Sequence, residues 1–368
     1  MQQALRLASR AAGHTRPNPL VGCVIVREGR VVGKGYHQRA GLPHAEVLAL
    51  RQAGTAAQGA TVYVTLEPCN HHGRTPPCTD ALLQAGVKRV VAAMEDPNPL
   101  VAGQGLHRLL AAGVAVTVGV CQAEAAMLNQ PFVTWITQGR PLVTLKMAAS
   151  LDGKTATRTG ESQWITGPLA RQAVHRLRAR HDGVLVGIGT VLADNPQLNC
   201  RLRGGRDPIR LVVDSTLKMP LEAAILTASR TAGIWIATTE HAPAARRRAL
   251  AQKVGERHDG QILLCRATPS GRVDLADLMA QLGQRGILSV LAESGATLSA
   301  ALWEAGLVDR LALFLAPLLI GGRMAPGLLQ GEGVARLAEA QRLTNLRVTP
   351  MGADLLLEGT VTRPCLQA

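Results

Sequence analysis

The segment TVYVTLEPCNHHGRTPPCTDALLQAGVKRVVAAM, residues 61–94, carries the pattern that decides the fold. It begins with an apolar, β-branched run typical of a buried strand, and a helical stretch follows that Gly86 ends. From this segment onward we predict a strand over 61–66, a helix over 79–85, a strand over 87–94, a helix over 106–112 and a strand over 114–120. Because strands that alternate with helices tend to lie parallel in one sheet, we expect a layered α/β domain.

Upstream of this segment the sequence predicts a hairpin between two helices. Two apolar runs separated by Arg27-Glu-Gly-Arg30 are typical of paired antiparallel strands. The predicted elements are a helix over 2–12, hairpin strands over 21–26 and 31–36, and a helix over 44–53 that Gly54 closes.

The alternation stops near residue 121, and a second series begins after residue 140. The stretch between them, 121–140, predicts a connecting helix and a linker. The second series contains apolar strands at 142–147, 184–186, 209–213, 234–236, 262–264, 287–291, 310–315 and 355–357. With no repeat between the halves, we expect two different domains, residues 1–140 and 141–368.

The bulk composition is that of a folded cytoplasmic protein. The chain has 368 residues, of which 47% are hydrophobic, enough for two buried cores. No apolar run is long enough to cross a membrane, and the N-terminus does not look like a signal peptide. Seven cysteines without regular spacing indicate reduced thiols used for metal binding or catalysis rather than a disulfide framework, with Cys23, Cys121 and Cys265 as packing residues.

A formal net charge of +14 favours anionic partners, either nucleic acid or phosphorylated small molecules. Only eight residues are Trp, Tyr or Phe (4, 2 and 2), which leaves few platforms on which bases would stack. We therefore expect no nucleic-acid partner and no membrane partner.

Three residues of the first domain form a typical catalytic zinc set. His44 opens a helix, Cys69 follows a strand and Cys78 precedes the next helix. One imidazole and two thiolates leave a fourth zinc position open for water, which zinc makes nucleophilic at neutral pH. Helix N-termini near the two thiols favour the thiolate. Glu46, two residues from His44, is the candidate for carrying the proton from water to the leaving amine.

Two features leave alternatives open. A structural zinc site would need a fourth ligand, which His71 or His72 could supply. Asn18 and His37 lie on expected loop edges just ahead of the motif, where such residues are more often turn formers.

The second half shows sites suited to phosphate. We predict an Arg-rich helix that is capped by Thr166 or Gly167 and has Pro168 in its first turn. A glycine-rich turn follows the strand that ends at Val186. Another strand leads into Glu293-Ser-Gly295 and a helix, whose backbone amides suit phosphate. No stretch matches the dinucleotide fingerprint closely, so the residues alone predict a phosphorylated ligand or a nucleotide.

The first motif resembles that of the zinc nucleobase deaminases, H-x-E followed by P-C-x-x-C, except that eight residues separate the cysteines here. With this longer loop, the chain is similar to the bifunctional deaminase/reductases of riboflavin biosynthesis. The motifs that carry the similarity are Glu67–Cys78, Ala149–Gly153, Ser162-x-Trp-Ile-Thr166, Thr190-x-x-x-Asp194-x-Pro-x-Leu198 and Glu293-Ser-Gly295.

The resemblance implies a three-layer α/β/α domain of the cytidine-deaminase type followed by an α/β domain like dihydrofolate reductase. It implies zinc-dependent loss of the 2-amino group from a phosphoribosylated diaminopyrimidinone, then NADPH-dependent reduction of the ribosylamino to a ribitylamino group. By motif position, the residues expected to line NADPH are Ala148, Trp164, Thr190, Asp194, Ser215, Gly295, Ala296, Thr297, Leu298, Ser299, Ala300 and Ala301. Those expected to hold the phosphorylated substrate are Ser162, Arg178, Leu198, Arg201 and Glu293.

The chemistry of these residues fits, since Arg178 and Arg201 offer forked donors for phosphate and Gly295 permits close approach of the cofactor. Asp194 is either a proton donor to the opened sugar or a turn residue, and Lys218 is a candidate for the NADPH 2′-phosphate. Two other functions are weighed, an editing deaminase acting on nucleic acid and a non-catalytic zinc protein. We also expect a homo-oligomer.

Overall fold

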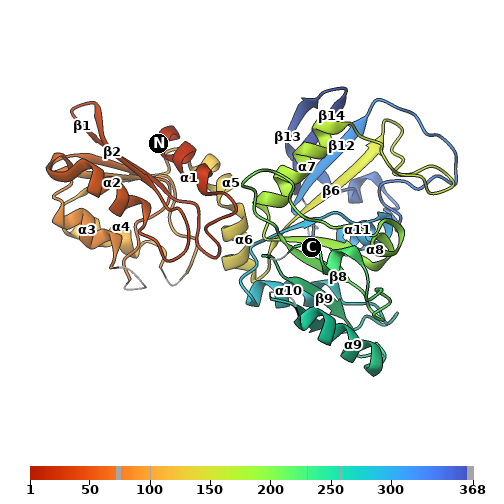
Figure 1. The fold of residues 1–368 in the computed structure, drawn as a ribbon. Coiled ribbons are helices and arrows are strands. Elements are labelled where there is room, and N and C mark those ends of the chain that lie inside the picture. The colour runs from red at the N-terminus through yellow and green to blue at the C-terminus, as the bar shows by residue number, and fades with distance from the viewer. Residues whose placement is uncertain (72–75, 100, 230, 257–258, 363–368) are drawn as a thin grey trace. The chain divides into compact units, whose positions relative to one another are not determined.

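The computed structural model describes residues 1–362 except 72–75, 100, 230 and 257–258. The chain divides into two compact units, Met1–Arg140 and Pro141–Ala368 (Figure 1), and each is considered by itself. Within the described residues, no helix is long and apolar enough to span a membrane. The six described cysteines are free thiols.

The first unit is built around a five-stranded sheet with the order β2-β1-β3-β4-β5. The hairpin strands β1 and β2 are antiparallel, β1 pairs antiparallel with β3, and β3, β4 and β5 run parallel. Its elements are α1 Gln2–Ala8, β1 Gly22–Arg27, β2 Arg30–Tyr36, α2 Ala45–Ala53, β3 Thr61–Val64, α3 Cys78–Gln84, β4 Arg89–Ala92, α4 Gln104–Ala111, β5 Ala115–Val118, α5 Gln122–Leu128 and α6 Gln130–Gln138.

Helices cover both faces of this sheet. Alternate side chains of β1 point to opposite faces, so Cys23 and Ile25 pack with α2, α3 and α4, whereas Val24 packs with α1. On that second face Leu66 and Met94 also pack against Ala125 of α5. The unit therefore has three layers, which confirms the predicted α/β/α arrangement.

The second unit contains a nine-stranded sheet with the order β10-β9-β8-β7-β11-β6-β12-β14-β13. The strands from β10 to β12 run parallel, and β14 and β13 extend the sheet antiparallel. Its elements are β6 Leu142–Ser150, α7 Pro168–Arg180, β7 Gly183–Gly187, α8 Ile188–Asp194, β8 Ile209–Val213, β9 Ile234–Thr238, α9 Ala244–Gly255, β10 Gln261–Leu264, α10 Leu275–Gln284, β11 Ser289–Ala292, α11 Ala296–Glu304, β12 Arg310–Ala316, β13 Arg342–Met351 and β14 Asp354–Thr362.

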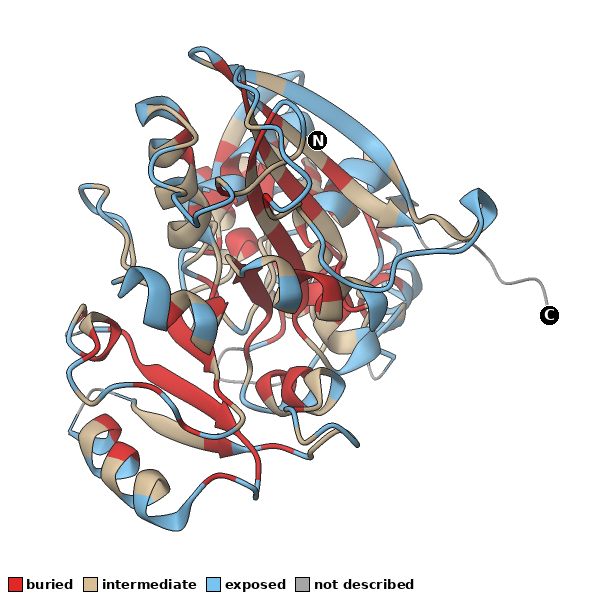
Figure 2. Ribbon diagram, turned by 90° about the vertical axis from the view of Figure 1, so that its right-hand side faces the viewer, coloured by how far each residue is buried: buried red, intermediate tan, exposed pale blue. Residues whose placement is uncertain are grey.

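Both faces of this sheet are also covered, and the buried residues concentrate in its strands (Figure 2). One face packs against α10 and α11, where Met279 and Leu302 are fully buried. The other packs against α9 through Leu250 and against α7 through Ala170. Because seven neighbouring strands are parallel, the loops that follow them meet at one edge of the sheet.

The structure differs from the sequence prediction in three places. Strand β13 was not predicted, because half of its residues are polar, most are exposed and Asn345 adopts a positive φ of 53°. The expected glycine-rich turn after Val186 is instead the start of α8, since only Gly187 lies outside the helix. The predicted connecting helix over 121–140 is two helices, α5 and α6, which meet at Asn129.

Candidate active sites

The three predicted metal ligands come from three consecutive elements of the first unit. His44 caps the N-terminus of α2, Cys69 lies in the loop after β3, and Cys78 is the first residue of α3. Gly35 of β2 allows α2 to pack closely, because a Cβ there would lie 2.4 Å from the Ala45 carbonyl oxygen. The glycine therefore helps to set the position of the start of α2, and with it the position of His44.

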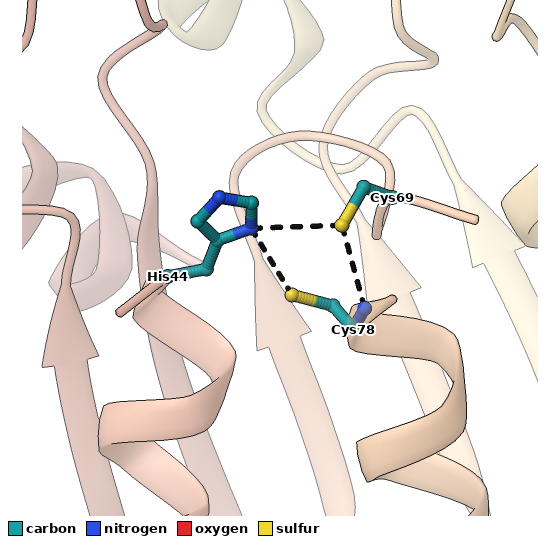
Figure 3. Close-up of side chains that lie close together, drawn as sticks. All are labelled: His44, Cys69 and Cys78. Carbon is teal, nitrogen blue, oxygen red and sulfur yellow. Dashed lines mark hydrogen bonds between the residues drawn. The ribbon is translucent and has the colours of Figure 1, made fainter. Parts of the chain in front are cut away.

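The structure brings these side chains together (Figure 3). His44 Nδ1 lies 3.5 Å from Cys69 Sγ and 3.3 Å from Cys78 Sγ, and the three candidate ligand atoms lie within 4.8 Å of one another. The backbone amide of Cys78 donates to Cys69 Sγ over 3.3 Å, so both sulfurs lie at the start of α3. No other group of three His, Cys, Asp or Glu among the described residues is arranged to hold a metal.

The two thiols share their protons unequally. A hydrogen bond from the Cys78 thiol, joined by one from His44, lowers the pKa of Cys69 to about 4. The same Cys69–Cys78 contact, together with burial, raises the pKa of Cys78. The His44 pKa is raised, chiefly by its hydrogen bond with Cys69. An imidazole and two adjoining thiols are the donor set that a zinc ion with one open position takes, so the residues fit that metal.

Glu46 lies in the first turn of α2 and is 3% exposed. Burial, followed by the nearby Cys69 charge, raises the pKa of Glu46 to about 7. Its Oε2 atom is buried and has no hydrogen-bond partner among the described residues. A buried polar oxygen normally has a partner, so this oxygen beside the three ligands suits a water or substrate proton.

Asn18 and His37 belong to this site, although the sequence alone suggested turn formers. The His37 and His44 rings lie edge to face with centroids 5.4 Å apart. His37 Nδ1 lies 3.3 Å from the Pro43 carbonyl oxygen and Nε2 lies 3.0 Å from Asn18 Nδ2. Since burial lowers the His37 pKa, a neutral ring that donates from Nδ1 and accepts at Nε2 satisfies both contacts. No spacing in the sequence links these two residues to His44.

His71 is described and exposed, whereas His72 lies outside the described residues. Among the described residues, His71 is not part of the metal-binding group. The fourth ligand that a structural zinc site would need is therefore not supplied by His71.

The sequence alone indicated no role for Glu67. Its buried carboxylate holds the segment that packs against the loop carrying Cys69. Oε2 accepts from the amides of Asp96 and Gly103 at 3.1 and 2.9 Å, and Oε1 accepts from the amide of Gly105 at 2.8 Å. A Cβ at Gly105 would lie 2.0 Å from the Pro68 carbonyl oxygen. The start of α4 thus packs directly on the turn before Cys69.

In the second unit, the predicted residues gather at the edge where the parallel strands end. Glu293 and Gly295 follow β11, Thr190 lies in α8 after β7, and Ser215 follows β8. A Cβ at Gly295 would lie 3.7 Å from Thr190 Oγ1, so the starts of α8 and α11 are adjacent. In parallel α/β sheets, ligands bind at this edge.

Arg178 and Glu293 form a buried ion pair. Arg178 Nε and Nη2 donate to the two Glu293 oxygens at 2.6 and 2.9 Å, and Nη1 donates to the Asn199 carbonyl oxygen at 3.1 Å. Glu293 therefore accepts two of the forked donors of Arg178, and the contact of Arg178 with the substrate stays a prediction. Burial lowers the pKa of Lys146 on β6, and the charges of Glu293 and Arg178 act on it as well.

Several predicted contacts are restricted by burial. Leu198 is 5% exposed, packs in the core and has a positive φ of 54°. Ser299 and Ala300 are also buried, and Ser299 Oγ donates to the Ser294 carbonyl oxygen. Of the predicted run 295–301, only Gly295 and Thr297 are exposed.

The remaining predicted residues lie on loops or helix ends. Trp164 is 70% exposed, and the Arg171 guanidinium lies 4.7 Å from its ring centroid. Ser215 Oγ accepts from the amide of Val273 at 3.0 Å. The others are Asp194, Arg201 and Lys218, which are exposed, and Ser162 and Ala148, which are half-buried.

Two family models match the chain. The model described as the cytidine and deoxycytidylate deaminase zinc-binding region matches residues 1–94, and the RibD C-terminal domain matches residues 141–357. The first match includes His44, Cys69 and Cys78.

Full-length relatives are similar in sequence and structure. The riboflavin biosynthesis protein RibD of Escherichia coli is 46% identical over 97% of both chains, and that of Aquifex aeolicus is 42% identical over 97% of this chain and 96% of its own. The structure of Acinetobacter baumannii RibD has a TM-score of 0.86, with 43% identity over 98% of both chains. A diaminohydroxyphosphoribosylaminopyrimidine deaminase/5-amino-6-(5-phosphoribosylamino)uracil reductase from Thermotoga maritima has a TM-score of 0.80, with 33% identity over 99% of this chain and 97% of its own.

Proposed function

This chain belongs to the RibD family, and from that membership we propose which of its residues carry each activity. It is a bifunctional enzyme of riboflavin biosynthesis, a zinc-dependent deaminase and an NADPH-dependent reductase. The second unit has the dihydrofolate-reductase-like α/β fold of the RibD reductase domain. The proposal assigns deamination to residues 1–140 and reduction to residues 141–368.

The proposed substrate of the first unit is 2,5-diamino-6-(5-phosphoribosylamino)pyrimidin-4(3H)-one. His44, Cys69 and Cys78 would hold zinc, which supplies the Lewis acidity that makes water nucleophilic at neutral pH. Water replaces the 2-amino group of the ring, and ammonia leaves. The single observation that carries the proposal is the convergence of these three ligands beside Glu46.

Glu46 moves the protons of this reaction. Its unpartnered Oε2 takes a proton from water, and the carboxyl then gives it to the ring nitrogen or the departing amine. Burial raises the pKa of Glu46, which helps its carboxyl to hold the proton between the two transfers. Asn18 and His37, held together by their hydrogen bond, lie beside His44 and support its ring.

In the second unit, NADPH supplies the hydride that converts the ribosylamino to the ribitylamino group. We assign the NADPH site to the edge formed by Ala148, Thr190, Ser215, Gly295 and Thr297. Glu293, held in place by Arg178, accepts hydrogen bonds from polar groups of the substrate. The exposed Arg201 binds the phosphate of the substrate. Asp194 stays the candidate proton donor, and Lys218 the candidate for the 2′-phosphate. The cytoplasmic location and the homo-oligomeric state also stay predictions.

Incubating the zinc-loaded chain with the ribotide while ammonia and the absorbance of NADPH are followed tests this assignment. We expect ammonia release without NADPH, and NADPH oxidation only after ammonia has been released, since the deaminated ring is the reductase substrate. Oxidation of NADPH by the ribotide without ammonia release would contradict the proposed order. The deaminated intermediate, supplied directly, is the control for the reductase alone.

A further inference from the structure

The motif Ala149–Gly153 spans the end of β6 and the turn after it, and it has no part in the functions assigned above. Its Asp152 is exposed, yet its carboxylate accepts three hydrogen bonds. The Ser150 hydroxyl donates at 2.5 Å, and the backbone amides of Ile320 and Gly321 donate at 3.1 and 2.7 Å. These contacts, the Ser150 hydroxyl first, lower the pKa of Asp152 to about 2. The carboxylate therefore joins the end of β6 to a segment about 170 residues further along the chain.

That segment, residues 317–333, is called the strap below. The strap follows β12 in the chain. Besides the contact with Asp152, it is held by residues on either side of Asp152. The amide of Leu151 donates to the Leu318 carbonyl oxygen at 2.8 Å, Lys154 Nζ donates to the Ala325 carbonyl oxygen at 3.2 Å, and the amide of Thr155 donates to the Pro326 carbonyl oxygen at 2.9 Å. In Figure 1 the strap is drawn in blue beside the yellow-green loop that follows β6.

The other end of the strap is fixed to α11. The amide of Gln330 donates to the Ala296 carbonyl oxygen at 3.3 Å, and the amide of Glu332 donates to Glu304 Oε1 at 2.9 Å. A Cβ at Gly331 would lie 1.8 Å from Glu304 Oε1 and 3.1 Å from Ala300 Cβ, so the backbone lies directly on the helix. The strap thus runs from the end of β6 to α11, which it contacts from Ala296, the first residue of the helix, to Glu304, the last.

These two anchor points flank the edge at which we assign NADPH. Strands β6 and β11 are parallel neighbours, so the loops after them lie side by side. A segment tied to both loops crosses the edge between them. Within the stretch that is held to the end of β6, the strap presents Leu319 and Met324, which are 74% and 76% exposed, and the adjoining Gly321 and Gly322 have positive φ.

We propose that the strap forms a wall of the NADPH site and that Asp152 is the residue that positions it. The inference rests on the proposed function of the second unit. Asp152 acts through the strap and not on the reacting atoms. Its two carboxylate oxygens accept from the consecutive amides of Ile320 and Gly321. These contacts hold the strap at the turn formed by Gly321 and Gly322.

The test compares Asp152→Asn with the wild-type chain. Asparagine has one acceptor oxygen where aspartate has two, and its amide group would face a backbone N–H, so at least one strap contact is lost. We expect KM for NADPH to rise roughly tenfold, equivalent to about 1.4 kcal/mol, while kcat changes little. A general loss of folded protein would instead lower kcat at an unchanged KM. Deamination by the same chain should not change.

A matched control is Asp277→Asn, in the same unit. Asp277 also accepts a backbone amide, that of Arg266 at 3.0 Å, and its pKa is likewise lowered, but it does not contact the strap. We expect its KM for NADPH to equal that of the wild-type chain. An equal rise in KM in both variants, or no rise in Asp152→Asn, would overturn the proposal.

Limited digestion with trypsin gives a second measurement that does not depend on turnover. Arg323 lies exposed on the strap. We expect saturating NADPH to slow cleavage after Arg323 in the wild-type chain, and Asp152→Asn to be cleaved faster without NADPH. Equal cleavage with and without NADPH would overturn the inference. If the wild-type chain failed to oxidise NADPH with its substrate, the proposed function would fail, and protection of Arg323 would still decide whether the strap lines the cofactor site.

Discussion

Replacing Glu46 with glutamine is expected to lower the rate of deamination by roughly 10²- to 10⁴-fold, the range usual for removing a general acid–base group. Glutamine has almost the same shape but neither takes nor returns a proton. Because Glu46 is not one of the three metal ligands, zinc bound per chain should stay the same. Ammonia release and zinc content, measured on the same sample, check both parts of the prediction.

The matched control for this variant is Glu124→Gln. Glu124 also lies in the first turn of a helix of the same unit, but it is exposed and remote from the ligands in sequence. Its deaminase activity should equal that of the wild-type chain. Unchanged turnover in Glu46→Gln would remove the proposed proton carrier, and loss of zinc in that variant would mean that the effect arises from the metal site instead.

Glu293→Ala is expected to reduce substrate-dependent NADPH oxidation by at least roughly 30-fold, since truncating one partner of a buried charge pair costs about 2–5 kcal/mol or more and each 1.36 kcal/mol is about tenfold in rate. The side chains of Arg178 and Glu293 are only 14% and 8% exposed, so alanine leaves the guanidinium buried without its carboxylate. The variant also removes the group proposed to meet the substrate. Deamination, which belongs to the other unit, should continue at the wild-type rate.

Two further variants separate loss of function from loss of the fold. Glu293→Gln keeps the shape and one acceptor for Arg178, so it should stay folded by circular dichroism and still be impaired in reduction. Glu256→Ala breaks only an exposed contact with Lys253, 3.6 Å long, and should change neither stability nor activity. A folded Glu293→Gln with full reductase activity would contradict the proposed role of Glu293.

Much of the fold could be predicted because its strands are apolar runs bounded by glycine or charge. Strand β8 was predicted with its observed bounds, Ile209–Val213, and α7 begins at Pro168 after a Gly167 cap, one of the two caps proposed. Strand β13 lacked such a signal, because most residues of this edge strand are exposed and only Leu343 and Met351 pack partly against the core. In α8, Gly189 suggested a turn, whereas the stretch is helical and buries Val191 in the core of the unit.

The candidate sites divide in the same way. His44, Glu46, Cys69 and Cys78 are recognisable because metal chemistry requires certain residue types at element ends. Glu67 and the Asn18–His37 pair are not, because their roles come from contacts between segments that are distant along the chain. Arg178 shows a third case. Its residue type suits phosphate, but only the fold shows that Glu293 already occupies its donors.

Burial also limits which ligand contacts can be assigned to a residue from its position in a family motif. Leu198, Ser299 and Ala300 lie in matching motifs, yet their side chains are 5%, 1% and 3% exposed. A motif position indicates where the backbone passes a ligand, and it does not say which way the side chain points.

The most direct test of the account is a zinc titration of the deaminase. A chelator removes the metal from the purified chain, zinc is returned in steps, and ammonia release from the ribotide is measured at each step. We predict that deamination disappears without zinc and returns in proportion to the zinc bound, up to a single equivalent per chain, while reduction of the deaminated intermediate is unaffected throughout. A metal-free chain that deaminates the ribotide at the full rate would contradict the account.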